Sequence, residues 1–182
     1  MAMGYRYGGD TGSPSKAFTN VPTRTIRINK ELPTAVAALS YAYELSNALQ
    51  AKSYTCIQEV ARLRKCSRRQ YVDAVVEREA RSVLLRSRVA REIGLCHLVK
   101  NQTYNWIERG PGGDDQKVKA IVQEIRQNGT VYRGAITVDD HYGHIYDSLH
   151  GPGATDAPPA SSPWACRPSR YNALMMTAVK GP

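Results

Sequence analysis

Four polar residues in this chain of 182 residues have types and spacings that suit chemistry at one site. Tyr43 and Asn47 lie four residues apart in the segment 39–50, whose apolar residues recur at the helical period. They therefore share one helix face, with Glu44 beside them. Glu79 falls on the apolar face of a second predicted helix, and an inward carboxylate must be paired, neutralised or ligated. We therefore expect these four side chains to act together.

The stretch Leu39–Gln50 resembles the L-A-H-E-L-x-H-A-L-Q helix of zinc metallopeptidases. In H-E-x-x-H, two histidines hold zinc and the glutamate activates a water molecule. Here Tyr43 and Asn47 stand where both histidines would be, while Glu44 is retained. Glu79-Ala80-Arg81-Ser82 is similar to the E-A-x-A pattern that supplies the third ligand in gluzincin-type zincins, and Glu77-x-x-Ala80 fits the alternative E-x-x-A. The resemblance covers residues 23–95 and implies a degenerate, zincin-like relative of the metallopeptidases.

The two replacements change the chemistry that this helix pair can perform. Zinc prefers nitrogen and sulfur ligands, so a phenol and an amide are weak substitutes. Glu44 then lacks a metal-bound water to activate. Glu77 is explained by an exposed pair with Arg81, which leaves Glu79 as the better candidate. We expect no metal or cofactor and no zinc proteolysis, but a buried polar network or a remodelled pocket.

A second cluster of titratable groups lies between Asp139 and His150, where three of the four histidines occur. His141 and His144, with neighbouring carboxylates, could bind a metal or act as acid and base. A polar surface turn after a strand would have the same composition. Tyr132-Arg133-Gly134 is similar to the Arg-bearing strand of ADP-ribosyltransferase toxins, although the order of the other motifs differs; Arg133 is therefore a candidate binding residue.

A basic segment follows the first two predicted helices. It contains Arg62, Arg64, Lys65, Arg68 and Arg69, with Tyr71 close by. Phosphate contact is one interpretation, and a solvated helix end is the other. The net charge of +9 and a pI of about 9.5 favour an anionic partner without identifying it.

The spacing of apolar residues and breakers predicts the elements that position these groups. We expect a flexible lead-in over 1–20 and a short strand over 23–29 at a sheet edge. Pro33 should open the helix of the motif, and residues 51–69 should form a short helix and a loop. A long helix is expected over 68–93, ended by Gly94.

The second half is expected to contain a loop over 101–115 and a helix from Asp114 or Asp115 to Asn128. A strand over 130–138 and a long loop over 151–169 should follow. The prediction is one α+β domain over 21–182, with a metallopeptidase-like helical core at 23–95 and C-terminal strands and a long loop at 130–182. Two or three long helices should pack on a small, mostly antiparallel sheet.

Two functions remain open at this stage. The first is a secreted bacterial effector or toxin-type domain, delivered into a target cell as part of a larger polypeptide and otherwise cytoplasmic. Its expected partner is an acidic cognate inhibitor, an immunity protein. The alternative is a non-catalytic basic module that binds nucleic acid or an acidic protein. No apolar run is long enough to span a membrane. Cys56 and Cys66 could form a bridge, although reduced thiols fit the sequence better.

Overall fold

The computed structural model describes residues 4–12, 16–128 and 137–150, which form an α+β fold. The helices are α1 (Thr34–Leu49), α2 (Ala51–Arg62), α3 (Arg68–Glu92), the 3-10 helix η1 (Cys96–Leu98), α4 (Thr103–Arg109), α5 (Asp114–Asn128) and α6 (Val138–His150). The strands are β1 (Arg6–Tyr7), β2 (Ala17–Asn20) and β3 (Thr25–Ile28). The predicted α+β class with a mainly helical core is therefore confirmed.

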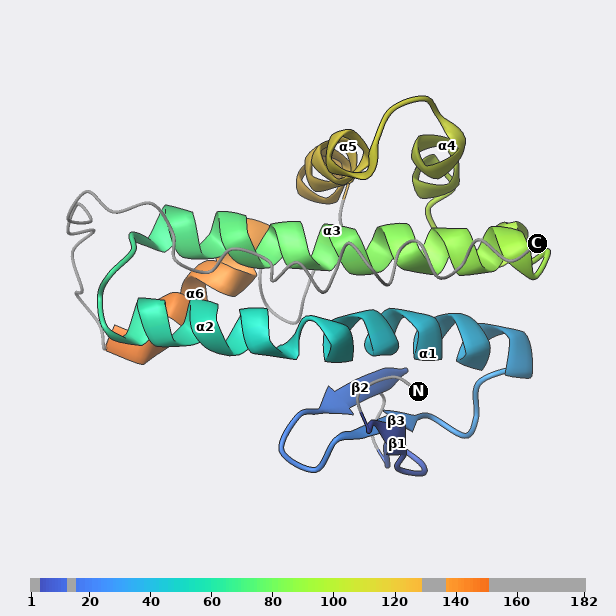
Figure 1. Cartoon of the computed structure of the whole chain (residues 1–182), viewed down its shortest axis with the longest axis horizontal. Helices are drawn as coiled ribbons and strands as arrows, with labels where there is room; N and C mark the ends of the chain where they lie inside the picture. The colour runs from blue at the N-terminus through green and yellow to red at the C-terminus, as the bar shows by residue number, and fades with distance from the viewer. Residues whose placement is uncertain (1–3, 13–15, 129–136, 151–182) are drawn as a thin grey trace.

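Helix α3 lies at the centre of the molecule (Figure 1). Helices α1 and α2 run end to end along one side of it, and the sheet packs on the far side of α1. Helices α4 and α5 cover the opposite side of α3, while α6 packs against α2, α3 and α5. A helix that is surrounded in this way buries most of its circumference, which makes α3 the scaffold for every site considered below.

The ends of α3 follow from its sequence, and the predicted span of 68–93 is confirmed to within one residue. Ser67 accepts a hydrogen bond from the Gln70 backbone N–H at 3.2 Å, and the Gln70 side chain accepts one from the Ser67 N–H at 2.9 Å. This capping box satisfies two N–H groups at the start of the helix. Gly94, with φ of +73°, ends it in the left-handed conformation.

Arg78 of α3 is only 5% exposed although its side chain is charged. The reason is that α1 and α2 cover one side of α3 and α4–α6 cover much of the rest, so a polar position on the helical wheel is still enclosed.

Helices α1 and α2 confirm the predicted helix after Pro33 and the short helix that follows it. They meet at Gln50, whose φ of −95° and ψ of 2° interrupt the helical path. The Gln50 side chain is buried, and its Nε2 donates to the Ser82 Oγ at 3.0 Å. The break between the two helices is thus fixed by a contact with α3.

The sheet differs from the prediction in three respects. Its strand order is β1-β3-β2, so β3 is the central strand and not an edge. It is mixed, because β1 pairs with β3 in parallel and β2 pairs with β3 in antiparallel fashion. Residues 6–7 and 17–20, expected in a flexible lead-in, form β1 and β2. Strands of two and four residues are too short to show the alternation on which sequence reasoning depends.

Two helices occur where other structure was expected. Helix α4 replaces part of the predicted loop 101–115, because Tyr104 and Glu108 are buried at helical spacing. Helix α6 replaces the polar turn and the strand end after residue 137. Thr137 and Asp140 cap α6 reciprocally, and Val138 and Tyr146 are buried on one face. The predicted strand residues 129–136 and the loop and terminus from 151 lie outside the described residues.

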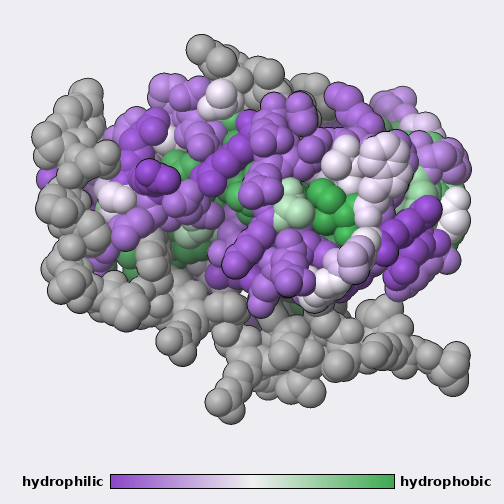
Figure 2. Space-filling view, turned by 90° about the horizontal axis from the view of Figure 1, so that it is seen from above, coloured by the Kyte–Doolittle hydropathy of each residue, from purple (hydrophilic) through white to green (hydrophobic). Residues whose placement is uncertain are grey.

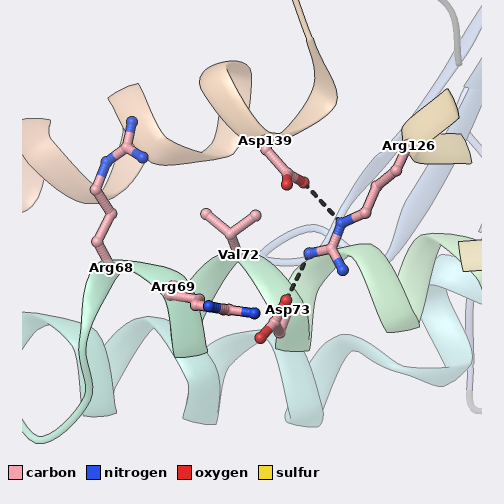
Figure 3. Close-up of a pocket in the computed structure, with 6 residues that line it drawn as sticks. All are labelled: Arg68, Arg69, Val72, Asp73, Arg126 and Asp139. Atoms are coloured by element: carbon pink, nitrogen blue, oxygen red, sulfur yellow. Dashed lines mark hydrogen bonds and ion pairs between the residues drawn. The ribbon is translucent and has the colours of Figure 1, made fainter. Parts of the chain in front are cut away.

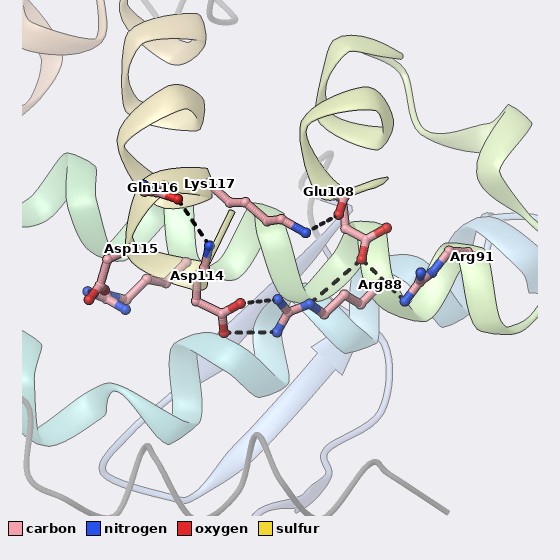
Figure 4. A network of polar contacts seen from close by, with 9 residues as sticks. Arg88, Arg91, Glu108, Asp114, Asp115, Gln116 and Lys117 are labelled. Carbon is pink, nitrogen blue, oxygen red and sulfur yellow. Dashed lines mark hydrogen bonds and ion pairs between the residues drawn. The ribbon is translucent and has the colours of Figure 1, made fainter. Parts of the chain in front are cut away.

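An ion network joins α4 and α5 to α3 (Figure 4). Glu108, 3% exposed, lies 3.3 Å from Arg91 and 3.8 Å from Arg88. Arg88 also pairs with Asp114 at the start of α5, and this hydrogen bond lowers the pKa of Asp114 against the opposing effect of its burial. The carboxylates at two helix ends therefore converge on neighbouring arginines of α3.

The surface seen from the side of α4 and α5 is mostly hydrophilic, with hydrophobic residues visible in patches between the polar ones (Figure 2). None of the helices in the described ranges has the length and hydropathy required to cross a membrane. Cys66 is a free, buried thiol, and burial raises its pKa to about 11. The bridge considered between Cys56 and Cys66 is therefore not formed.

Candidate functional site

The structure places Tyr43, Glu44, Asn47 and Glu79 in two neighbouring groups of hydrogen bonds between α1, α2, α3 and β2, which we call together the polar network. The two groups are linked by the charge of Glu79, which acts on Glu44. Glu79 on α3 accepts a hydrogen bond from the Tyr43 hydroxyl of α1 and another from the Tyr54 hydroxyl of α2, the second at 3.1 Å. The inward orientation predicted for Glu79 is confirmed. Glu77 pairs with Arg81 at 2.8 Å on the outer side, also as predicted.

Glu44 is held from the side of the sheet. Its Oε2 accepts a hydrogen bond from the Thr19 Oγ1 of β2 at 2.8 Å and a longer one from the Asn47 Nδ2 at 3.4 Å. Thr19 also donates to the Glu44 backbone carbonyl at 2.9 Å. The strand thus fixes both the side chain and the helical turn that carries it.

Ser82 connects the network to the centre of α3. This side chain is fully buried, and its Oγ donates to the Asn47 Oδ1 at 2.7 Å. It also accepts the hydrogen bond from Gln50, whose Nε2 lies 3.3 Å from the Arg78 carbonyl as well. A chain of hydrogen bonds consequently runs from β2 through α1 to α3.

Burial sets the electrostatics of this network. Burial raises the pKa of the Glu44 carboxyl, and the charge of Glu79 adds to this effect, while the hydrogen bonds from Thr19 and Asn47 oppose it. Burial and the nearby Glu79 raise the pKa of Tyr54 as well, which keeps that phenol protonated as a donor. The guanidinium of Arg86 lies 5.4 Å from the centre of the Tyr43 ring. A carboxyl with a raised pKa can hold or transfer a proton closer to neutral pH.

The network is made of carboxylate and hydroxyl oxygens and of the side-chain amides of Asn47 and Gln50. The described ranges of the chain contain no group of three or more His, Cys, Asp or Glu residues that could hold a metal ion. Hydroxyl groups and the Asn47 amide are the hydrogen-bond partners of the two glutamates. The carboxyl and hydroxyl groups of the network can form hydrogen bonds and transfer protons.

His141 and His144 are not part of this network. Both lie on α6, which packs on α2, α3 and α5, whereas the network joins α1, α2, α3 and β2. His144 is exposed, and His141 contacts the Tyr142 ring edge-on at 5.0 Å between centroids. The structure therefore does not place these histidines with Glu44 and Glu79, as the sequence had allowed.

The basic segment divides into two adjoining parts. We call the exposed side chains of Arg62, Arg64 and Lys65, at the connection between α2 and α3, the basic turn. Arg68 and Arg69, in the first turn of α3, line a cavity of about 310 Å³ together with Val72, Asp73, Arg126 and Asp139 (Figure 3). Arg133, the remaining candidate, lies outside the described residues.

Sequence reasoning missed several members of both sites. Gln50 and Ser82 could have been found, because Gln50 is three residues from Asn47 and Ser82 is three residues from Glu79 on their helices. Thr19, Tyr54 and Arg126 come from other elements, and only the tertiary structure brings them in. Comparison with protein-family models, curated proteins and solved structures finds no match to the chain.

Proposed function

We propose that this chain is a non-catalytic module that binds nucleic acid through the basic turn. The observation that carries the proposal is that Arg62, Arg64 and Lys65 are exposed and make no ion pair with any other described residue. They adjoin the arginine-lined cavity at the start of α3. By contrast, four arginines of α3 are paired with carboxylates: Arg68, Arg81, Arg88 and Arg91.

The geometry of the turn supports a binding role. Arg64 has φ of +53°, a left-handed conformation that costs a non-glycine residue about 1–2 kcal/mol. Backbone hydrogen bonds from Arg64 to Ala61 at 2.7 Å and from Lys65 to Val60 at 2.9 Å hold it there. Glycine would fit the position without strain, so the turn presents the Arg64 cation at an energetic cost.

Phosphate is a better match for this surface than protein carboxylates. Guanidinium groups donate pairs of hydrogen bonds to phosphate oxygens, and closely spaced cations on one turn suit a chain of regularly spaced phosphates. The start of α3 adds its partial positive charge. An acidic protein partner is the alternative that the experiment below distinguishes.

The test measures binding of a single-stranded oligonucleotide to the wild type and to the triple variant Arg62→Gln, Arg64→Gln, Lys65→Gln. The expected result is salt-sensitive binding by the wild type and at least a tenfold loss in the variant. The matched control is Arg27→Gln, Lys52→Gln, Lys119→Gln, which removes the same charge from exposed positions on β3, α2 and α5. Equal losses of affinity in both triple variants would contradict binding at a local surface. Tighter binding of an acidic polypeptide than of the oligonucleotide would contradict nucleic acid as the ligand.

A second function is favoured by the convergence of Glu44 and Glu79. In this proposal the chain is a secreted bacterial effector or toxin-type domain on a degenerate zincin-like scaffold, and the polar network supplies acid and base in place of zinc. The raised pKa of Glu44 beside a second carboxylate supports it. An acidic immunity protein would then be the natural partner of a chain with net charge +9.

Expression in a bacterial host tests this second function. Toxicity of the wild type should be lost in Glu44→Gln and in Glu79→Gln. It should persist in Glu77→Gln, a variant on the same helix that touches only the outer pair with Arg81. Absence of toxicity in the wild type, or toxicity that survives both inner substitutions, would contradict an effector acting through this network.

A further inference from the structure

Helix α4 presents a tryptophan side chain to solvent. Trp106 is 70% exposed, the largest fraction among the exposed large hydrophobic side chains of the described ranges. The helix itself is well packed, because Tyr104, Asn105 and Glu108 are all buried. An indole ring that a packed helix directs outward contributes little to the core and offers a large rigid surface to a partner.

Two hydrogen bonds show what lies beside Trp106. Gln102, four residues before it, donates through Nε2 to the Cys96 carbonyl at 3.1 Å. Arg109, three residues after it, donates through Nη2 to the Cys96 Sγ at 3.1 Å. Residues at this spacing share one helix face, so Trp106 lies between two side chains that both reach Cys96. Arg109 is also exposed, and we call the pair Trp106 and Arg109 the α4 platform.

The exposed charge around the platform is positive. Over residues 94–113 the one carboxylate is Glu108, which is 3% exposed and paired with Arg91. The same stretch contains two exposed cations, Lys100 and Arg109, and no ion pair joins either of them to another described residue. The surface next to the ring therefore attracts an anionic group.

The carboxylates just outside this stretch do not reverse its sign. Asp114 pairs with Arg88, and Asp115 pairs with Arg81. Glu92, at the end of α3, is then the carboxylate of this region without an ion pair to a described residue. Over residues 88–117 as a whole, five basic residues stand against four acidic ones, which leaves a net charge of +1.

A nucleobase with its phosphate is the ligand whose chemistry matches the platform. Every base has a flat π surface that stacks on an aromatic side chain, and a phosphate suits the neighbouring guanidinium. An acidic protein would use the cations but leave the ring exposed. A second copy of the chain would cover the ring but take unpaired cations out of water, which is costly. In a double helix the base faces are already stacked, so this surface favours a single strand.

We infer that the α4 platform stacks one base of a single-stranded nucleic acid on Trp106 and contacts an adjoining phosphate through Arg109. The bond to Cys96 uses one of the five N–H donors of that guanidinium and leaves others for the phosphate. The inference rests on the proposed function for its ligand and adds a second contact at the other end of α3 (Figure 1). This helix of 25 residues is roughly 37 Å long, so a strand that reaches both ends is held at two points.

The fluorescence of Trp106 tests the stacking. Trp164, the other tryptophan of the sequence, is replaced in Trp164→Phe so that Trp106 is the one indole left. Titration with a single-stranded oligothymidylate is expected to quench its emission saturably. A duplex of the same length should quench much less, because its bases are stacked on one another. Equal quenching by the two nucleic acids would contradict the stacking of an unpaired base.

The affinity of a labelled oligothymidylate tests the contribution of the ring. Trp106→Ala is expected to lower the affinity at least about fivefold, the lower limit for the loss of one stacked base, and Trp106→Phe should keep most of it. Tyr7→Ala is the matched control, because it removes a ring that is 61% exposed on β1. Unchanged affinity in Trp106→Ala, or an equal loss in Tyr7→Ala, would overturn the platform.

The same measurement tests the phosphate contact. Arg109→Gln should weaken binding a few-fold, whereas Lys52→Gln, which removes one cation from an exposed position on α2, should bind like the wild type. Equal affinities in these two variants would contradict a phosphate contact at Arg109.

Three outcomes separate the platform from the basic turn. If Trp106→Ala bound like the wild type while the triple variant of the basic turn lost affinity, the proposed function would stand and the platform would fall. If the triple variant kept the wild-type affinity and Trp106 were still quenched, the platform would stand and the basic turn would fall. Self-association that is lost in Trp106→Ala, with no quenching by the oligonucleotide, would assign the ring to a contact between copies of the chain and overturn the inference.

Discussion

Glu44 holds a carboxyl group at a position where burial opposes its charge. The sheet and the motif helix supply two donors, Thr19 and Asn47, but the neighbouring Glu79 adds a repulsion that they must offset. The burial of Glu44, which has apolar neighbours one turn away on its helix, would ordinarily be explained by the packing of that helix alone. Here the hydrogen bonds show that the polar atoms of Glu44, Asn47 and Ser82 are arranged around one another, so that a change in one alters the others.

Glu44→Gln is predicted to stabilise the fold at neutral pH. The pKa of Glu44 is raised in the folded state, so the ionised carboxyl destabilises the fold above that pKa and the penalty vanishes below the pKa of the unfolded chain. The variant should therefore gain roughly 0.5–2 kcal/mol in free energy of unfolding at neutral pH, as single stabilising changes commonly do. The gain should shrink as the pH falls through the ordinary carboxyl range.

Urea unfolding over a series of pH values measures this difference. Glu59→Gln is the matched control, since Glu59 is exposed on α2 and should change stability little at any pH. A loss of stability in Glu44→Gln at neutral pH would mean that the charge is favourable where it lies, contrary to the burial argument.

Only some residues of the candidate site could be predicted from the sequence. Helical periodicity placed Tyr43, Glu44 and Asn47 on one face and turned Glu79 inward, and the structure agrees. Periodicity relates residues within one helix only. Thr19 and Tyr54 reach the site from a short strand and from another helix, and no local pattern records where those elements dock.

At the scale of the elements, short-range rules predicted helices α1, α2, α3 and α5, whereas α4 was predicted as a loop. Pro33 opens α1 and Gly94 ends α3, as expected. Helix α6 was missed because its polar composition resembles a turn. Its helical form depends on the reciprocal Thr137–Asp140 cap and on Tyr146, whose hydroxyl donates to the Cys66 carbonyl at 2.8 Å.

Ser82→Ala is predicted to loosen the junction of α1 with α3. It removes the donor to the Asn47 Oδ1 and the shortest acceptor of the Gln50 Nε2, which keeps its longer bonds to Ser46 and to the Arg78 carbonyl. The expected loss is about 1–3 kcal/mol in free energy of unfolding. Ser148→Ala is the control, because that exposed hydroxyl bonds only to the Ile145 carbonyl of its own helix. If Ser82→Ala lost less free energy of unfolding than Ser148→Ala, the network would contribute nothing to the stability of this interface.

Arg64→Gly is predicted to raise stability while lowering affinity for nucleic acid. The left-handed φ of +53° is unstrained for glycine, so the fold should gain about 0.5–1 kcal/mol after the entropy of the more flexible unfolded chain is counted. The lost cation should weaken oligonucleotide binding by a few-fold. Thermal unfolding and a binding titration on the same preparation measure the two effects. Arg64→Gln separates them, because it removes the charge but keeps the strain.

At the scale of the whole molecule, α3 carries two sites that should work independently. Arg68 and Glu79 are eleven residues apart on one straight helix, or about 16 Å at 1.5 Å per residue. That separation exceeds the screening length of roughly 8 Å at physiological ionic strength. The polar network and the basic end of the helix therefore share a scaffold without sharing an electrostatic environment, and substitutions at one should leave the other unchanged.

The salt dependence of oligonucleotide binding tests this separation. For single strands the slope of log affinity against log salt concentration is about −0.7 for each phosphate neutralised. Removing Arg62, Arg64 and Lys65 together should make the slope shallower by about 2, because three contacts are lost. Glu44→Gln and Glu79→Gln should leave it as in the wild type, although both alter the net charge of +9 by one unit. If a glutamate variant shifted the slope as much as one turn cation does, binding would follow the overall charge of the molecule and not the surface at the start of α3.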